Sequence, residues 1–345
     1  MVYSNILETI GKTPLVRLHK TVTDIPAQVY AKLESFNPGL SAKDRIALHI
    51  IERAEQLGRL QPGGTVVDAT SGNTGFSLAM VCAWKGYRCV LTVTDKISKD
   101  KLNNLRAMGA EVILCPKDAR HDDPNSYVRR AEQLAREIPG AFYANQNFNL
   151  DNSEAHYLGT GPEIWEETNG KVTWLIGSTS TGGTLCGTGR YLREQNPNVR
   201  IVAVDAYGSV LKKYHETGIF DESEIGPYHI EGTGKNFIPG NVDFELIDRF
   251  IKVTDKDGAL RTRELARREG ILAGYSSGAV LQCLHQIKGQ LTPDDVVVLL
   301  FADHGSKYVS KVFDDDWMRS QGFLDEASDE ETLVSINIAP QRIKA

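Results

Sequence analysis

The sequence has few of the features that mark secreted, membrane or metal-binding proteins. Its 345 residues include five cysteines, an odd number, and no two form the Cys-x-x-Cys pair that holds zinc or runs redox chemistry. No run approaches the roughly 20 apolar residues that span a bilayer. The N-terminus also lacks the charged and then apolar stretches of a secretory signal. We therefore expect a cytoplasmic protein with no membrane contact, no bound metal and cysteines packed in its core.

An excess of basic residues is also absent. Asp and Glu outnumber Lys and Arg by 45 to 39, the formal net charge is −6, and no long block is basic. A nucleic-acid partner is therefore not expected, because phosphate backbones are bound through clusters of Lys and Arg. Hydrophobic residues make up 41% of the chain, which suffices for a buried core in one large domain or in two lobes.

Short apolar runs alternate with amphipathic stretches along the chain. This alternation predicts an α/β fold in which parallel sheets are covered by helices on both faces. The expected strands are residues 28–33, 66–69, 89–93, 111–115, 174–176, 200–204 and 296–301. The expected helices are residues 46–57, 74–84, 99–108, 126–137, 155–167 and 258–269.

Two turns rich in Gly, Ser and Thr, at residues 70–75 and 178–184, each lie between an expected strand and a helix. Ligands of parallel sheets bind at such positions. The second turn offers hydroxyls and backbone N–H groups to a phosphate. It lacks the glycine patterns typical of ATP and dinucleotide sites, so those ligands are disfavoured. A tight structural turn is an equally good interpretation of this segment alone.

Lys43 stands at the opening of an expected helix that continues through Ile46 and His49. The positive end of a helix dipole favours the neutral amine that Schiff-base chemistry requires. A solvated surface lysine is the commoner outcome for such a residue taken alone.

Four segments in register resemble the cysteine synthase and cystathionine β-synthase family, which are fold-type II pyridoxal-phosphate enzymes. They are Asn37-Pro38 through Ser41-Ala42-Lys43-Asp44-Arg45, Ser71-Gly72-Asn73-Thr74-Gly75, Thr181-Gly182-Gly183-Thr184 and Ser276-Ser277-Gly278-Ala279. The resemblance extends over about residues 3–324, through segments such as Asp303-His304-Gly305-Ser306-Lys307-Tyr308. The later segments are most similar to cystathionine β-synthase catalytic cores.

This resemblance implies two lobes of the tryptophan synthase β-like kind. Residues 1–40 and 147–324 would form a larger cofactor-binding lobe, and residues 41–146 a smaller mobile lobe. The acidic and polar residues 325–345 would form a tail that is too short for the regulatory domain pair of many such synthases. The implied assembly is a homodimer.

The resemblance also implies pyridoxal 5′-phosphate as the cofactor. Lys43 would form the Schiff base and later move the Cα proton, Asn73 would hydrogen-bond the phenolic oxygen, and Ser276 would face the ring nitrogen. The phosphate would be held by Ser180, Thr181, Gly182, Gly183 and Thr184. The carboxylate of the amino-acid substrate would be bound by Thr70, Ser71, Gly72, Thr74 and Gln146.

A serine at the ring nitrogen leaves the pyridine unprotonated, which favours elimination at Cβ over transamination. The implied reaction is β-replacement on serine, cysteine, O-acetylserine or phosphoserine through an aminoacrylate. Its product would be cystathionine, cysteine or another β-substituted alanine. Two alternatives remain: β-elimination, as in a cysteine desulfhydrase or serine dehydratase, and an inactive cofactor-bearing binding protein.

The sequence departs from the family pattern near both expected ligands. Ser180 replaces the first glycine of the usual phosphate loop, and its hydroxyl still suits a phosphate. Lys235 and Asn236 stand where similar cystathionine β-synthases tend to carry an acidic pair. We therefore expect both residues to contact the second substrate and to alter which nucleophile enters. A solvent-facing loop cation is the alternative for Lys235.

Overall fold

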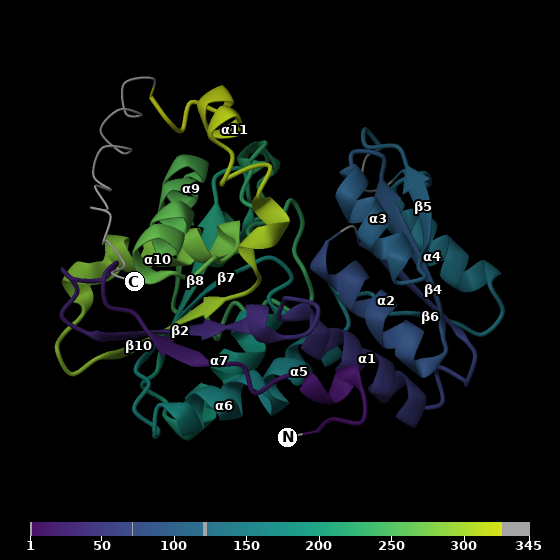
Figure 1. Cartoon of the computed structure of the whole chain (residues 1–345), viewed down its shortest axis with the longest axis horizontal. Coiled ribbons are helices and arrows are strands. Elements are labelled where there is room, and N and C mark those ends of the chain that lie inside the picture. The colour runs from purple at the N-terminus through teal and green to yellow at the C-terminus, as the bar shows by residue number, and fades with distance from the viewer. Residues whose placement is uncertain (1, 71, 120–122, 326–345) are drawn as a thin grey trace, which may run out of the picture.

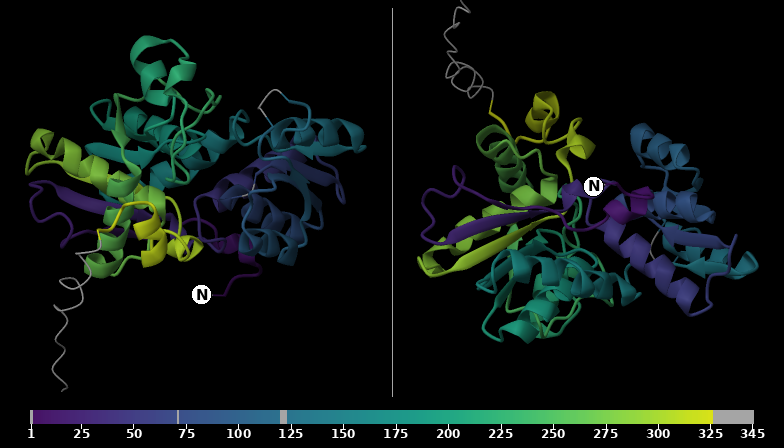
Figure 2. Two further views of the ribbon diagram at one scale, coloured as in Figure 1. Left: turned by 90° about the horizontal axis from the view of Figure 1, so that it is seen from above. Right: turned by 60° about the horizontal axis from the view of Figure 1, so that its bottom comes forward.

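The computed structural model describes residues 2–70, 72–119 and 123–325. Two lobes lie side by side, each built on its own sheet (Figure 1, Figure 2). Strands β1 and β2 run antiparallel, and the other strand pairs of the described chain are parallel. The predicted α/β class with two parallel-rich sheets is therefore confirmed.

The sheet of the larger lobe is buried on both faces. Successive residues of its central strand alternate between two apolar clusters: Val297 and Leu299 face the cluster of α10, whereas Val298 and Leu300 face the cluster of α7. Such two-sided burial is typical of parallel strands. The strand order is β1 (Leu15–Arg17), β2 (Gln28–Leu33), β10 (Val296–Phe301), β7 (Trp174–Ser178), β8 (Arg200–Ala206) and β9 (Arg249–Val253). Helices α9 (Asp255–Glu264) and α10 (Tyr275–Ile287) cover one face, and α6 (Thr160–Glu167) and α7 (Gly183–Gln195) cover the other.

The sheet of the smaller lobe is built in the same way. Val66 and Leu91 pack toward one set of helices, whereas Val67 and Val90 pack toward α4. The strand order is β5 (Glu111–Cys115), β4 (Arg88–Thr94), β3 (Thr65–Ala69) and β6 (Ala141–Tyr143). Helices α1 (Lys43–Gln56), α2 (Asn73–Lys85) and α3 (Lys99–Ala107) lie on one side, and α4 (Tyr127–Glu137) lies on the other.

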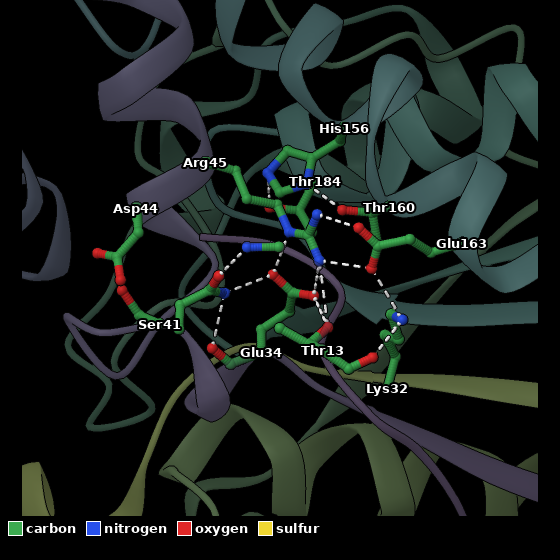
Figure 3. A network of polar contacts seen from close by, with 12 residues as sticks. Thr13, Lys32, Glu34, Ser41, Asp44, Arg45, His156, Thr160, Glu163 and Thr184 are labelled. Carbon is green, nitrogen blue, oxygen red and sulfur yellow. Dashed lines mark hydrogen bonds and ion pairs between the residues drawn. The ribbon is translucent and has the colours of Figure 1, made fainter. Parts of the chain in front are cut away.

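A buried ion network ties the first turn of α1 to the larger lobe (Figure 3). Arg45 Nε lies 2.7 Å from Glu34 Oε2, and Arg45 Nη1 lies 2.7 Å from Glu163 Oε1. Lys32 Nζ lies 2.9 Å from the other oxygen of Glu163. Burial would raise the pKa of Glu34, but Arg45, with smaller contributions from Thr13 and Lys32, outweighs burial and holds that pKa below its ordinary value. The network therefore fixes the turn that carries Lys43.

Some elements differ from the sequence-based expectation. The single helix expected over residues 155–167 is two helices, α5 (Asp151–Leu158) and α6, which meet at Gly159. A Cβ at Gly159 would lie only 3.1 Å from both Ala155 O and Arg45 Nη1, so the chain passes this point closely packed. Strands β1, β6 and β9 were not predicted.

The remaining elements are α8 (Leu211–Thr217), α11 (Asp315–Ser320), the 3-10 helices η1 (Ile6–Thr9), η2 (Glu34–Phe36), η3 (Glu222–Glu224), η5 (Lys288–Gln290) and η6 (Gly305–Tyr308), and the π-helix η4 (Leu265–Glu269).

The lobe boundaries expected at residues 40/41 and 146/147 stay a prediction, and the expected tail lies almost wholly outside the described residues. In the described part of the chain, no helix is long and apolar enough to cross a membrane. Across the same residues, no three His, Cys, Asp or Glu side chains are grouped so that they hold a metal ion. The five cysteines are buried and free of disulfides.

Candidate active site

A cavity of about 530 Å³ lies between the two lobes, where β3, β7 and β10 end. Its volume is typical of small-molecule sites. Parallel strands carry their following loops to one edge of a sheet, and this explains why distant segments meet here. The predicted site residues that line the cavity are Lys43, Thr70, Gly72, Asn73, Thr74, Gln146, Ser180, Thr181, Gly182, Thr184, Lys235 and Ser276.

The other predicted site residues are not among those that line the cavity. Gly183 packs at the start of α7, where an added Cβ would overlap Asn152 Oδ1. Asn236 is exposed and does not line the cavity, so the geometry gives no support to its predicted contact with substrate. Ser71 lies outside the described residues.

Lys43 is the first residue of α1 and is half-buried in the cavity wall. Within residues 2–70, 72–119 and 123–325, no hydrogen bond or ion pair engages its Nζ. Burial lowers the pKa of Lys43 below that of an ordinary lysine, although the carboxylates of Asp303 and Glu34 act in the opposite direction. An unpaired amine with a lowered pKa is a candidate nucleophile toward a carbonyl group.

The N-terminus of α7 is open to an anion. The residue before the helix is Gly182, whose φ of 91° favours glycine and which provides no side-chain cap. A Cβ at Gly182 would also lie 2.6 Å from Val242 Cγ2. The first N–H groups of α7 and the hydroxyls of Thr181 and Thr184 are thus gathered at one place, which suits a phosphate.

His156 holds one of these hydroxyls in place (Figure 3). Its Nε2 lies 3.1 Å from Thr184 Oγ1, and its Nδ1 lies 2.8 Å from Thr160 Oγ1. Burial lowers the pKa of His156 well below its ordinary value, so the ring is neutral near pH 7. A neutral ring donates at one nitrogen and accepts at the other, and it therefore fixes both threonines without adding charge.

The loop after β3 and the loop after β6 meet at a second group of donors. Thr74 Oγ1 donates to Gln146 Oε1 over 2.6 Å, and both side chains are buried. Gln146 Nε2 keeps its hydrogens without a partner among the described residues. Gly72 precedes α2 without a side-chain cap, so N–H groups of that helix are also available. Such donors suit a carboxylate.

Lys235 is half-buried and lines the cavity, so the solvent-facing alternative does not describe it. The N–H of the preceding Gly234 donates to Thr179 O over 2.7 Å, which anchors this segment beside the phosphate loop. Lys235 Nζ lies 5.0 Å from the centroid of the Phe237 ring and has no ion-pair partner in the part of the chain described. Burial, and then the charge of Lys43, lower the pKa of Lys235 to about 8.

Sequence reasoning missed several charged residues that line the cavity. Asn73 Nδ2 donates to Asp303 Oδ2 over 2.8 Å, and Lys307 Nζ donates to Asn73 Oδ1 over 2.6 Å. Lys101 and Glu231 also line the cavity, and Lys101 Nζ lies 2.6 Å from Glu231 Oε2. The available signal for Asp303 was an acidic residue just beyond a strongly apolar strand, at the edge where ligands bind.

This donor set fits pyridoxal 5′-phosphate. It contains an unpaired amine at Lys43 and an open helix terminus for a phosphate. Ser276, in the first turn of α10, is 3% exposed, and no hydrogen bond engages its hydroxyl among the described residues. A buried hydroxyl without a partner on a cavity wall is available to a ligand atom.

Comparison with known proteins gives the family that the sequence motifs resemble. A model of the pyridoxal-phosphate dependent enzyme family matches residues 6–303. The cystathionine beta-synthase of Apis mellifera is 39% identical over 322 residues, which are 93% of this chain and 63% of that protein. The cysteine synthase of Staphylococcus aureus strain Mu50 is 40% identical over 307 residues, or 89% of this chain and 95% of that protein.

Two solved structures are also similar. O-ureido-L-serine synthase has a TM-score of 0.85 and 35% identity, and the match covers 97% of this chain and 100% of that one. A hydrogen sulfide-producing enzyme from Fusobacterium nucleatum has a TM-score of 0.81 and 34% identity, and the match covers 89% of this chain and 98% of that one. The chain spans less than two thirds of the length of the A. mellifera synthase but nearly all of the S. aureus enzyme. This chain therefore belongs to the family of pyridoxal-phosphate dependent enzymes, among relatives of cystathionine β-synthase and cysteine synthase.

Proposed function

We propose that this enzyme catalyses β-replacement on a serine- or cysteine-type amino acid and that Lys43 carries its cofactor. The observation that carries the proposal is the half-buried amine of Lys43, which has no partner among the described residues. This amine lines the same cavity as the N-terminus of α7, which has no side-chain cap and is open to a phosphate. The donor is serine, cysteine, O-acetylserine or phosphoserine, and the acceptor is a nucleophile such as a thiol or an amine.

The cofactor supplies an electron sink that stabilises the negative charge left when a proton leaves Cα. We assign its phosphate to the turn before α7, with side chains of Ser180, Thr181 and Thr184 and N–H groups of Gly182 and Gly183. We assign its phenolic oxygen to Asn73 and its ring nitrogen to Ser276. Because a serine hydroxyl is neutral, it does not force a proton onto the ring, and loss of a β-substituent is favoured over transamination.

Lys43 is also the residue that moves the Cα proton in this proposal. Burial lowers its pKa, so more of the amine is neutral near pH 7 than for an exposed lysine. A neutral amine accepts the proton, and the resulting ammonium returns it after the nucleophile has added. Asp303 stabilises the ammonium between these two events.

The carboxylate of the donor binds at the start of α2. Thr74 and Gln146 hold each other through their 2.6 Å hydrogen bond, which leaves Gln146 Nε2 for the carboxylate. Thr70 adds a hydroxyl, Gly72 precedes the uncapped helix, and we also assign Ser71 to this group. Several fixed donors orient the Cα–H bond toward the amine that accepts its proton.

Lys235 selects acceptors that carry a carboxylate. Its cation is half-buried and lacks an ion-pair partner in the described chain, so an incoming carboxylate gains an interaction that the protein does not already satisfy. Asn236 is exposed outside the cavity, and we assign it no contact with the acceptor.

A panel of donors and acceptors tests the reaction. Serine, cysteine, O-acetylserine and phosphoserine are each incubated with the purified holoenzyme, alone and with thiol or amine acceptors, and the products are identified by mass spectrometry. The proposal requires a β-substituted alanine that forms only when donor and acceptor are both present. Pyruvate released equally with and without acceptor would establish β-elimination instead, whereas an unchanging cofactor spectrum would indicate a binding protein.

Elimination is the second candidate, because the hydrogen sulfide-producing enzyme from F. nucleatum is similar over 89% of this chain. We also propose a cytoplasmic homodimer, as the family resemblance implies. Light scattering of the purified protein and fractionation of the source cells test these two proposals.

A further inference from the structure

A buried carboxylate stands where three active-site segments meet. Asp303 is 2% exposed and lines the cavity just beyond β10. Its backbone forms a bridge with Ser41, and its carbonyl accepts the N–H of Gly274 over 3.0 Å. Lys43 comes two residues after Ser41, and Ser276 comes two residues after Gly274. The backbone therefore places Asp303 beside both turns that carry proposed cofactor contacts.

The packing around this carboxylate is specific. A Cβ at Gly274 would overlap Asp303 Oδ1, so only glycine fits there. Oδ1 is buried and has no hydrogen-bond partner in the described chain, whereas Oδ2 accepts from Tyr308 Oη over 2.7 Å and from Asn73 Nδ2 over 2.8 Å. A charge held this far from water needs neighbouring cations and donors to remain ionised.

Asp303 and Lys307 together determine how the Asn73 amide is turned. Asn73 Nδ2 donates to the carboxylate, and Asn73 Oδ1 accepts from Lys307 Nζ over 2.6 Å. A flipped amide would set its oxygen against the carboxylate and its NH₂ group against the ammonium, and both contacts would be repulsive. One hydrogen of Nδ2 remains for a ligand in the cavity.

The same carboxylate also acts on the charge of Lys43. Burial raises the pKa of Asp303, but the Lys307 ammonium and the hydrogen bonds from Asn73 and Tyr308 oppose this effect. Asp303 in turn opposes the lowering of the Lys43 pKa by burial. Glu34, the other carboxylate that acts on Lys43, is already paired with Arg45.

We propose that Asp303 is a positioning residue of the active site, which orients the Asn73 amide toward the cofactor and supplies the negative charge opposite the nitrogen of Lys43. This role rests on the proposed attachment of the cofactor to Lys43. Neither the sequence motifs nor the family comparisons assign a function to this aspartate.

The charge is tested with Asp303→Asn, which keeps the size and one acceptor oxygen. The visible absorbance of the substrate-free holoenzyme is titrated with pH, so no turnover is required. Asp303 is the larger of the two charges that raise the pKa of Lys43, and loss of an opposite charge near an amine lowers the pKa of that amine. We therefore expect the midpoint for proton loss from the nitrogen of Lys43 to fall by about one pH unit, the lower end of the typical effect of a neighbouring charge. Other charged groups also affect the pKa of this nitrogen, namely Glu34, which is paired with Arg45, and the cation of Lys235. The nearby His156 is neutral, and the ammonium of Lys307 faces Asn73. All of these groups are present in both the parent and the variant, so the difference in midpoint reports the Asp303 charge.

Asp205→Asn is the matched control. Asp205 is also buried near the end of a strand and also has one oxygen without a hydrogen-bond partner among the described residues, but it does not line the cavity. Its replacement should leave the midpoint within about 0.3 pH unit of the parent protein. A midpoint that does not move in Asp303→Asn, or moves equally in Asp205→Asn, would overturn the role of the charge.

The orientation of Asn73 is tested with Asp303→Ala, which removes the acceptor as well. Cofactor should be lost during dialysis several-fold faster from Asp303→Ala than from Asp303→Asn, because Asn73 Nδ2 then loses its acceptor and only Lys307 still restrains the amide. Lys307→Met removes the opposite restraint without a change in the aspartate and should also speed cofactor loss, even if the aspartate variants fail to fold. Equal loss from all of these proteins and the parent would overturn the orienting role.

Borohydride reduction and peptide mapping separate this inference from the proposed function. A label on a residue other than Lys43 would remove the basis of both. A label on Lys43 together with an unmoved titration midpoint would refute only the role of Asp303.

Discussion

Replacement of Lys235 by methionine removes one positive charge from the cavity wall and keeps most of the side-chain volume. In the parent protein, Lys235 Nζ has no ion-pair partner among the described residues and lies 5.0 Å from the centroid of the Phe237 ring. A hydrogen bond to a charged group contributes about 1.5–3 kcal/mol. At about 1.4 kcal/mol per factor of ten, its loss should lower kcat/KM for an acidic acceptor about 10- to 100-fold.

The assay compares a thiol acid with a thiol alcohol, for example 3-mercaptopropionate and 2-mercaptoethanol, with a single donor. The ratio of the two kcat/KM values isolates the carboxylate, because both acceptors use the same first half of the reaction. Lys311→Met is the matched control, because Lys311 pairs with Glu231, which lines the cavity, but does not line the cavity itself. That control should change the ratio by less than about threefold.

The dependence on pH gives a second test of the same residue. With a pKa of about 8, Lys235 is charged at lower pH and becomes neutral as the pH rises through about 8. The preference for the acidic acceptor should therefore decline across that interval in the parent protein and stay flat in Lys235→Met. An unchanged ratio in the variant, or a slower first half-reaction with donor alone, would show that Lys235 serves the cofactor or the donor and would refute the reasoning.

Three further predictions concern stability and the cofactor. Lys235→Met should raise the melting temperature at pH 7, because a partly buried cation without an ion-pair partner is replaced by an apolar group. This gain should shrink between about pH 8 and about pH 10, because the Lys235 amine of the folded parent loses its proton at lower pH than that of the unfolded chain. Thermal unfolding of both proteins across this pH range measures both effects. Ser276→Asp should strongly reduce β-replacement, because a carboxylate favours a protonated ring nitrogen, and unchanged steady-state rates would show that Ser276 does not face the ring. Arg45→Met should lower the free energy of unfolding in urea by about 3–5 kcal/mol, because it leaves the fully buried Glu34 without its main counter-charge; a loss below about 1 kcal/mol would contradict this account of the network.

The sequence predicted three strands with their observed bounds. β2 and β10 are neighbours inside the larger sheet, and every residue of β10 is buried, whereas β5 is an edge strand of the smaller sheet and only Cys115 of it is fully buried. Each of the three is a run of five or six residues rich in apolar, β-favouring side chains. β6 has only three residues, and β9 at the sheet edge mixes buried and exposed positions, so neither leaves a clear apolar run. The break at Gly159 arises from close packing against Arg45, which a local pattern does not encode.

The site likewise has a part that the local sequence predicts and a part that only the folded chain creates. The phosphate loop was predictable because its backbone requires glycine: Gly182 has a φ of 91° and no room for a side chain. The pair formed by Asn73 and Asp303 spans 230 positions, and only the folded chain brings its members together. The exposure of Asn236 likewise depends on how its loop is folded, and the adjacent position of Lys235 gave no indication of it.

The location of the cofactor tests the central claim most directly. The holoenzyme is reduced with borohydride and digested, and the modified peptide is identified by mass spectrometry. In the described chain four lysines line the cavity, namely Lys43, Lys101, Lys235 and Lys307. Our account predicts a modified lysine at Lys43 alone. Lys235 is also half-buried, lowered in pKa and without an ion-pair partner among the described residues, but only Lys43 lies in the segment Ser41-Ala42-Lys43-Asp44-Arg45, which resembles the cofactor-binding segment of the family. Modification of Lys101, Lys235 or Lys307 instead would contradict it.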